Sequence, residues 1–214
     1  MFILVIKKIT SLPFIPNKHR IRLALSSARE RLLGLDFTLP DRMYDRNRND
    51  GAMYYATPPS ALKALFETID PSFDSFIDIG CGKGYVLYKA KKFGFAKVGG
   101  IEYDSKLTEI CRKNLKRLKM DSSVNVTCTD ARTFEYYNDY NVFYFFNPFV
   151  EEVMEGVISR IVEQCPGKEV TIVYYRPRYP KPIESRPFFV KQAELYDSIN
   201  GYTANVYRGI IPKE

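Results

Sequence analysis

Short apolar runs alternate with longer amphipathic segments along residues 73–175. A continuous apolar run is typical of a strand buried on both faces, whereas apolar residues three and four positions apart are typical of a helix. The pattern predicts strands over residues 73–79, 97–102, 124–128, 141–146 and 169–175. It predicts helices over residues 61–68, 84–93, 105–119 and 150–164, the first capped by Thr57 or Ser60. Strands that alternate with helices predict a parallel sheet covered on both faces.

The alternation ends after residue 175, and two strand-like segments follow at residues 187–196 and 202–211. Between them, Asn200-Gly201 is a strong hairpin signal. The expected fold class is therefore α/β, with a Rossmann-like doubly wound sheet, mostly parallel with a C-terminal antiparallel hairpin, plus an N-terminal helical extension. We expect residues 1–53 to form a basic helical extension with a charged loop, and residues 54–214 to form the α/β domain.

A glycine-rich turn follows the first predicted strand, which carries Asp78 near its end. Glycine at positions 80, 82 and 84 permits a tight turn, a close approach of a ligand to the backbone, and close packing of the next helix. A strand, glycine loop and helix in this order favour a nucleoside site. A dinucleotide motif would require glycine where the chain has Tyr85, and Lys83 lacks the spacing of a P-loop. A glycine turn without a ligand is the remaining alternative.

Polar residues also follow the other predicted parallel strands. Glu102 lies 24 residues after Asp78, where a carboxylate can accept hydrogen bonds from ribose hydroxyls. Asp130 follows the third strand, where it can accept from an adenine amino group while the next backbone N–H donates to the ring. Asn147 follows the fourth strand. Taken singly, each of these residues is also compatible with a cap or a solvated surface position.

The net charge of +7 is concentrated near the N-terminus. Residues 1–36 contain seven Lys or Arg residues and two acids, a net charge of +5. Such a basic arm favours an anionic partner, either nucleic acid or a membrane surface, although a solvated helix face has the same composition. The segment Arg176–Pro182 and the charged loop 41–53 are expected to border an acceptor site.

Four cysteines are scattered without C-x-x-C spacing, which argues against a zinc site and favours a reducing, cytoplasmic location. No apolar run approaches the ~20 residues of a membrane-spanning helix. The apolar start Met1–Ile6, followed by Lys7 and Lys8, is compatible with a peripheral membrane contact.

In this order and spacing, the glycine loop, the acids at the strand ends and Asn147-Pro148-Phe149 resemble the class I, seven-strand S-adenosylmethionine-dependent methyltransferases over about residues 55–211. The resemblance implies that S-adenosyl-L-methionine is the cofactor and that residues 54–214 are the methyltransferase domain. It also implies that the cofactor site consists of Asp78, Gly80, Cys81, Gly82, Gly84, Glu102, Tyr103, Asp130, Ala131 and Asn147. Within that set, Asp78 and the loop hold the methionine end, Glu102 the ribose, and Tyr103 stacks near the adenine.

The predicted acceptor site consists of Asn147, which would orient the nucleophile, and of Phe149 and Tyr55, which would form pocket walls. These residues loosely resemble the non-SET protein-lysine methyltransferases, whereas Phe149 departs from the Asn-Pro-Pro-Tyr motif of enzymes that act on nucleobases or glutamine. The single histidine, His19, lies in the basic arm, so a histidine base in the core is not expected. The sequence predicts N-directed transfer to a protein side chain or small molecule. The alternatives are an RNA or other nucleic-acid methyltransferase and a non-catalytic nucleoside-binding scaffold.

Overall fold

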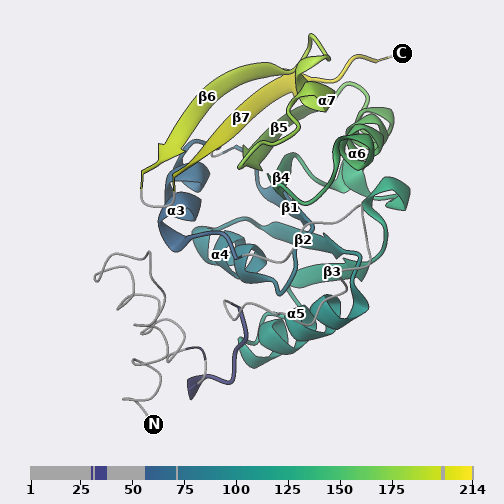
Figure 1. The fold of residues 1–214 in the computed structure, drawn as a ribbon. Coiled ribbons are helices and arrows are strands. Elements are labelled where there is room, and N and C mark those ends of the chain that lie inside the picture. Colours follow the sequence, from purple (N-terminus) through teal and green to yellow (C-terminus); the bar gives the residue numbers. More distant parts are fainter. Residues whose placement is uncertain (1–29, 31, 38–55, 71, 199–200, 214) are drawn as a thin grey trace.

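Seven strands form one sheet in a computed structural model that describes residues 30, 32–37, 56–70, 72–198 and 201–213 (Figure 1). The spatial order is β3-β2-β1-β4-β5-β7-β6. The strands are β1 (Ser75–Ile79), β2 (Lys97–Glu102), β3 (Val124–Cys128), β4 (Val142–Phe146), β5 (Glu169–Tyr175), β6 (Val190–Asp197) and β7 (Tyr202–Ile210). The first five strands are parallel, and β7 runs antiparallel to both β5 and β6. The predicted doubly wound, mostly parallel sheet with a C-terminal antiparallel hairpin is confirmed.

Helices cover both faces of the sheet (Figure 1). One face packs against α3 (Pro59–Glu67), α4 (Tyr85–Phe93) and α5 (Ser105–Arg117). The other face packs against α6 (Glu151–Gln164), α7 (Lys181–Glu184) and the short 3-10 helices η1 (Ala131–Thr133) and η2 (Tyr137–Asp139). Parallel strands joined by helical crossovers place their carboxyl ends on one edge of the sheet, where ligands bind in folds of this kind.

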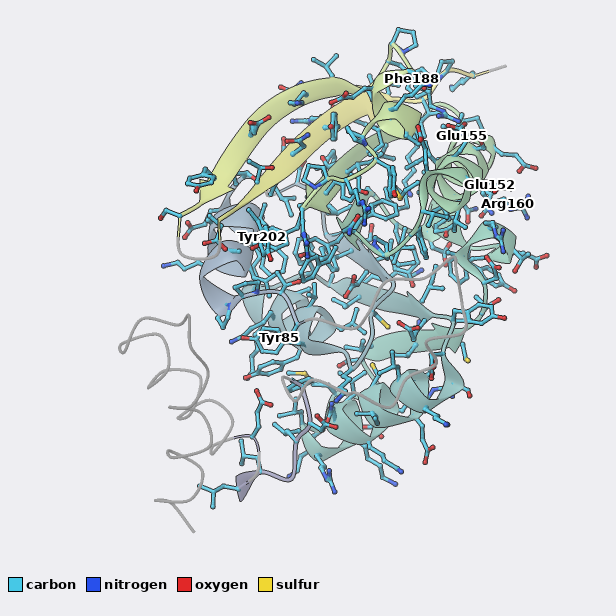
Figure 2. All side chains as sticks on the ribbon, in the orientation of Figure 1. Tyr85, Glu152, Glu155, Arg160, Phe188 and Tyr202 are labelled. Carbon is cyan, nitrogen blue, oxygen red and sulfur yellow. The ribbon has the colours of Figure 1, made fainter. Side chains whose placement is uncertain are left out.

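Two apolar cores explain why the central strands have continuous apolar runs. Successive residues of a strand point to opposite faces, so Phe76 and Tyr144 enter the core under α3 and α4, whereas Ile77 and Phe143 enter the core under α6. All four side chains are fully buried, and side chains fill both layers (Figure 2). Because each such side chain contributes about 1.5–3 kcal/mol when buried, the two cores fix the strand register strongly.

The predicted bounds of the five parallel strands and the three helices between them lie within two residues of the observed ones. The predicted cap of the preceding helix is wrong. That helix begins at Pro59, its N-cap is Pro58, and no side chain caps it. The Thr57 hydroxyl instead lies 2.9 Å from the buried Tyr144 hydroxyl on β4. Proline at the first helical position explains the early start, because its fixed φ suits a helix and its missing N–H needs no cap.

The N-terminal extension contributes to the core through its described residues. Leu35 and Phe37 are buried in the apolar cluster that contains α4 and α5. Residues 1–29 and 31 of the basic arm, the charged loop 41–53 and Tyr55 lie outside the described residues. The boundary at residue 53 stays a prediction. Among the helices that the structure describes, none is long and apolar enough to cross a membrane.

Candidate cofactor and acceptor site

The glycine loop between β1 and α4 depends on glycine at three positions. Gly80, Gly82 and Gly84 have φ values of 86°, 52° and 85°, in the left-handed region that other residues rarely adopt. A Cβ atom added to Gly80 would lie 2.8 Å from Cβ of Pro148, and one added to Gly84 would lie 2.5 Å from Sγ of Cys111. The loop is therefore packed closely against the segment after β4 and against α5.

Most backbone amides of this loop form hydrogen bonds within the protein. Those of Gly80 and Cys81 donate to the Ile101 carbonyl at 2.8 and 2.9 Å. The Gly82 amide donates to Oε2 of Glu102 at 2.8 Å, and the Gly84 amide donates to the Cys81 carbonyl at 2.9 Å. A phosphate-binding loop needs amides that point at the ligand. Few amides of this loop lack a hydrogen bond within the protein, so the loop geometry disfavours a bound phosphate.

Two buried acids lie beside the loop and favour the binding of a positively charged group. Asp78 on β1 is 3% exposed and Glu102 at the end of β2 is 9% exposed. Burial raises the pKa of Asp78 well above its ordinary value, and the Glu102 charge raises it further. Burial also raises the pKa of Glu102, against the effect of backbone hydrogen bonds from Asp104 and Gly82. A positively charged ligand group would stabilise both carboxylates in their ionised forms.

Asp78 lacks a protein partner among the described residues: no hydrogen bond or ion pair there reaches its carboxylate. Both carboxylate oxygens of Glu102 already accept backbone N–H groups, from Gly82 at 2.8 Å and Asp104 at 2.9 Å. An ionised buried carboxylate without a partner is costly. The ammonium and sulfonium groups of S-adenosylmethionine therefore fit a site lined by these two carboxylates better than the phosphates of a dinucleotide.

The residues expected around the adenine follow β2 and β3. Asp130 caps η1 and forms an ion pair with Arg132, with 2.6 Å between Oδ2 and the guanidinium nitrogen. Ala131 is buried, and its carbonyl accepts from the Tyr137 hydroxyl at 2.7 Å. Tyr103 is 49% exposed directly after Glu102. The backbone directly after β3 joins this group to the site, because the Thr129 amide donates to the Glu102 carbonyl at 3.0 Å.

The segment after β4 meets the glycine loop through the contact between Pro148 and Gly80. Asn147 precedes that proline and has φ 40°, which is strained for a residue other than glycine. Its Oδ1 atom is buried without a hydrogen-bond partner in the described part of the chain. Phe149 is partly buried and packs against the core under α6. Tyr55, the other predicted pocket wall, lies outside the described residues.

The Cys81 side chain packs against β2 and against Cys111 of α5. It is buried, and a Cβ atom added to Gly100 of β2 would lie 2.8 Å from its sulfur. A hydrogen bond with the Cys111 thiol and burial raise the pKa of Cys81 well above its ordinary value. A thiol in this state is inert as a nucleophile, so only the Cys81 backbone is a candidate for ligand contact.

Two residues that hold the loop were not predicted from the sequence. Lys83 has a completely buried side chain whose Nζ lies 2.8 Å from Oδ1 of Asp36. Asn114 of α5 is 1% exposed and donates to the carbonyls of Lys83 and Asp36. The one available signal was a lysine between two glycines in a packed turn, because such a lysine needs a counter-charge when it is buried.

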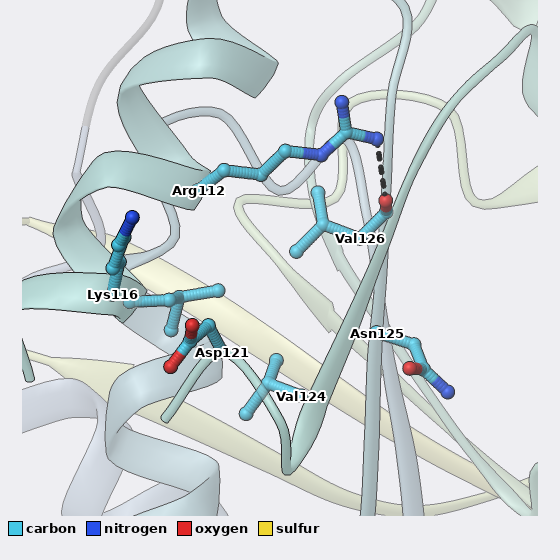
Figure 3. Close-up of a pocket in the computed structure, with 7 residues that line it drawn as sticks. Arg112, Lys116, Asp121, Val124, Asn125 and Val126 are labelled. Carbon is cyan, nitrogen blue, oxygen red and sulfur yellow. Dashed lines mark hydrogen bonds between the residues drawn. The ribbon is translucent and has the colours of Figure 1, made fainter. Parts of the chain in front are cut away.

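A separate shallow pocket lies between α5 and β3 (Figure 3). Its lining includes Arg112, Lys116, Asp121 and Asn125, and Arg112 donates to the Val126 carbonyl at 2.9 Å. The strand residues that line it pair with Val98–Gly100, before the carboxyl end of β2. This pocket therefore lacks the loop and the acids of the candidate site.

Comparisons with known proteins agree with the geometry. Residues 76–165 match a family described as a methyltransferase domain. No curated protein matches the chain.

Among solved structures, an RNA methyltransferase from Salinibacter ruber in complex with S-adenosyl-L-homocysteine is 23% identical, with a TM-score of 0.55 over 74% of this chain and 94% of that chain. A geranyl diphosphate C-methyltransferase from Streptomyces coelicolor is 10% identical, with a TM-score of 0.55 over 71% of this chain and 78% of that chain. A protein of the NADB-Rossmann superfamily from Streptococcus agalactiae is 12% identical, with a TM-score of 0.60 over 74% of this chain and 70% of that chain.

At these identities the solved structures show a shared fold, and the match over residues 76–165 is the evidence for a methyltransferase domain. The methyltransferase-domain match over residues 76–165 and the seven-strand, Rossmann-like sheet support an S-adenosylmethionine-dependent methyltransferase.

Proposed function

We propose that the enzyme transfers the methyl group to a nitrogen atom of a protein side chain or a small molecule. The observation that carries this proposal is the buried, unpartnered Oδ1 of Asn147 at the end of β4. A buried polar atom without a partner is costly, and such atoms are rare in folded proteins. An acceptor amine that donates an N–H group to this oxygen would remove the cost and would be oriented by the same contact.

The position of Asn147 supports this role. Asn147 follows the last paired residue of β4 and connects to the glycine loop through Pro148. Left-handed backbone strain of this kind costs roughly 1–3 kcal/mol and tends to occur at functional sites. An acceptor held there would lie beside the cofactor loop, so the two reactants would be held next to each other.

The residues of the chain contribute positioning and desolvation. Asp78 would hold the cationic methionine end of the cofactor, and Glu102 would accept from the ribose while it fixes the Gly82 amide. When bound, S-adenosylmethionine supplies a methyl group that is already activated for displacement. Alignment of reactants at attack distance can lower a barrier by about 7–11 kcal/mol, so a neutral amine needs orientation more than it needs a strong base.

Arginine–tyrosine pairs after β5 support a second candidate function, methylation of RNA. The guanidinium of Arg176 lies 4.6 Å from the ring centre of Tyr202, and that of Arg178 lies 5.5 Å from the ring centre of Tyr179. Arg176 follows Tyr175, which pairs with Phe146 one residue before Asn147. Guanidinium and aromatic planes stack on single-stranded bases, and the charge of +7 suits an anionic acceptor. The Salinibacter ruber RNA methyltransferase has the same fold.

Transfer of a tritiated methyl group into fractionated cell lysate tests the acceptor class. We expect the label in a protease-sensitive or a small-molecule fraction. A label that is sensitive to ribonuclease would contradict the first proposal and support RNA methylation. Label bound to oxygen or carbon, as determined by hydrolysis and mass spectrometry of the product, would contradict nitrogen transfer in either class.

Replacing Asn147 with glycine is expected to lower kcat about 10-fold to 100-fold, because the acceptor loses one orienting hydrogen bond. The Kd for S-adenosylmethionine is expected to stay within about twofold, and stability to rise by about 1 kcal/mol as the strain is removed. The measurements are methyl transfer into the fraction labelled by the wild type, calorimetric cofactor binding, and denaturant unfolding.

Lys119→Gly is the matched control, because Lys119 also has a left-handed φ, 56°, but lies on the exposed surface beyond the end of α5. We expect it to gain similar stability and to keep wild-type kcat. An Asn147→Gly variant with wild-type kcat would exclude Asn147 from acceptor orientation.

Cofactor affinity is expected to increase with pH. The pKa of Asp78 is raised by burial and by the Glu102 charge, so the free enzyme must lose a proton before the carboxylate can pair with the cofactor ammonium. Binding should release protons at pH values where Asp78 of the free enzyme is still protonated, provided that the cofactor α-amino group, with an ordinary pKa near 7.7–8.0, is charged. Calorimetry in two buffers of different ionisation enthalpy measures the release. If Asp78→Asn released as many protons on cofactor binding as the wild type, Asp78 would be ruled out as the source of the protons.

A further inference from the structure

The described residues just before the α/β domain form a short strap, residues 34–37, that contacts the cofactor loop. Asp36 of the strap lies 2.8 Å from Nζ of Lys83, which stands between Gly82 and Gly84. The Lys83 side chain is 0% exposed, whereas that of Asp36 is 33% exposed. A buried ammonium group requires a counter-charge, so this ion pair ties the middle of the loop to a segment 47 residues earlier in the chain.

Asn114 of α5 fixes the strap and the loop with a single amide group. Its Nδ2 donates to the Asp36 carbonyl at 2.9 Å and to the Lys83 carbonyl at 3.0 Å. Its Oδ1 accepts from the Asp36 amide at 2.9 Å. The Arg117 guanidinium also donates to the Gly34 carbonyl. The strap therefore has backbone contacts to α5 that do not depend on the Asp36 carboxylate.

Phe37 extends the contact to the first turns of α4. Phe37 is 2% exposed, and the centre of its ring lies 5.5 Å from that of Tyr85 and 5.8 Å from that of Tyr88. Tyr85 is labelled in Figure 2. Gly84 is the N-cap of α4 and provides no side-chain cap. The conformation of the loop exit therefore depends on surrounding contacts, and the strap supplies several of them.

We propose that Asp36 is a positioning residue for S-adenosylmethionine binding: through Lys83 it holds the glycine loop in its binding conformation, so the strap is part of the cofactor site. The inference rests on the proposed location of the cofactor at this loop. It concerns cofactor binding alone and is independent of the identity of the acceptor.

Asp36→Asn is the test, because the variant keeps the size of the side chain and the backbone contacts to Asn114 while it removes the charge. We expect the Kd for S-adenosylmethionine, measured by calorimetry without acceptor, to rise about 10-fold or more. We also expect faster hydrogen exchange over residues 82–88, and recovery of affinity in Asp36→Glu. In a Lys83→Met background, Asp36→Asn should have no further effect on Kd.

Asp139→Asn is the matched control. Asp139 forms an ion pair of similar length, 2.7 Å, with Lys97 at the start of β2, away from the loop. We expect wild-type affinity from this variant. Equal affinity in Asp36→Asn and the wild type would overturn the inference, as would a loss of stability in Asp36→Asn with unchanged Kd. A wild-type protein that bound no cofactor would instead overturn the placement of the cofactor at the loop.

Discussion

Asp78→Asn is expected to weaken S-adenosylmethionine binding by about 2–5 kcal/mol, which is roughly a 30-fold to 5,000-fold rise in Kd. The reason is the combination of burial and charge at this position. Asp78 is 3% exposed and has no partner among the described residues, so a bound ammonium group would be its natural counter-charge. Asparagine has nearly the same shape but cannot neutralise that cation. Calorimetric titration with cofactor measures the change.

The same substitution should leave the cofactor-free protein at least as stable as the wild type at neutral pH. The folded-state pKa of Asp78 is raised above its ordinary value of 3.8. The stability that this group contributes is therefore fully present below that value and is lost as the pH rises through the raised pKa. Asparagine does not ionise and avoids this loss. The exposed Asp121→Asn is a control for both measurements, and wild-type affinity in Asp78→Asn would exclude Asp78 from the cofactor site.

Gly84→Ala is expected to destabilise the protein by about 2–5 kcal/mol and to abolish most cofactor binding. About 1–2 kcal/mol comes from the left-handed backbone, since φ is 85°. A further ~1–3 kcal/mol comes from overpacking, because the new Cβ would lie 2.5 Å from Sγ of Cys111. Denaturant unfolding measures the loss of stability, and calorimetry measures the loss of cofactor binding.

Two further variants separate strain from overpacking. Gly201→Ala has a similar φ of 71° and no atom within 4 Å of the added Cβ, so it should show only the backbone cost. Cys111→Ala removes the clashing sulfur, and the remaining Cβ contact would be 3.6 Å, which is ordinary van der Waals distance. In a double-mutant cycle, Cys111→Ala should therefore restore about 1–3 kcal/mol to Gly84→Ala. Simple additivity would show that the clash is relieved by other movements.

Local patterns predicted the layered fold well. The central strands are buried on both faces, so each appears in the sequence as a short apolar run whose ends are easily located. The glycine loop and the strand-end acids were also recognisable, because their chemistry depends on residue type at fixed spacing. The four-residue helix α7 was not predicted, since it begins at Lys181 within a proline-rich segment and is too short to show a period.

Contacts between distant parts of the chain could not be predicted in the same way. Thr57 has the preferences of a helix cap, yet its hydroxyl is 2.9 Å from that of Tyr144, a residue 87 positions later. Asp36 appeared to be one of two acids in a basic arm, and its pairing with Lys83 required the folded positions of α5 and the loop. The orphan Oδ1 of Asn147 depends on burial that only the assembled strands create.

The position of β7 between β5 and β6 has a consequence for synthesis. The ribosome makes β6 before β7, but β6 joins the sheet only through β7. Until residues 202–210 have been made, β5 has an open edge of unpaired N–H and C=O groups on a strand of strongly apolar sequence. An open apolar edge is a template for pairing with other chains. Nascent chains that stall after β6 therefore carry an aggregation site, and the cell's chaperones have a defined interval in which to protect it.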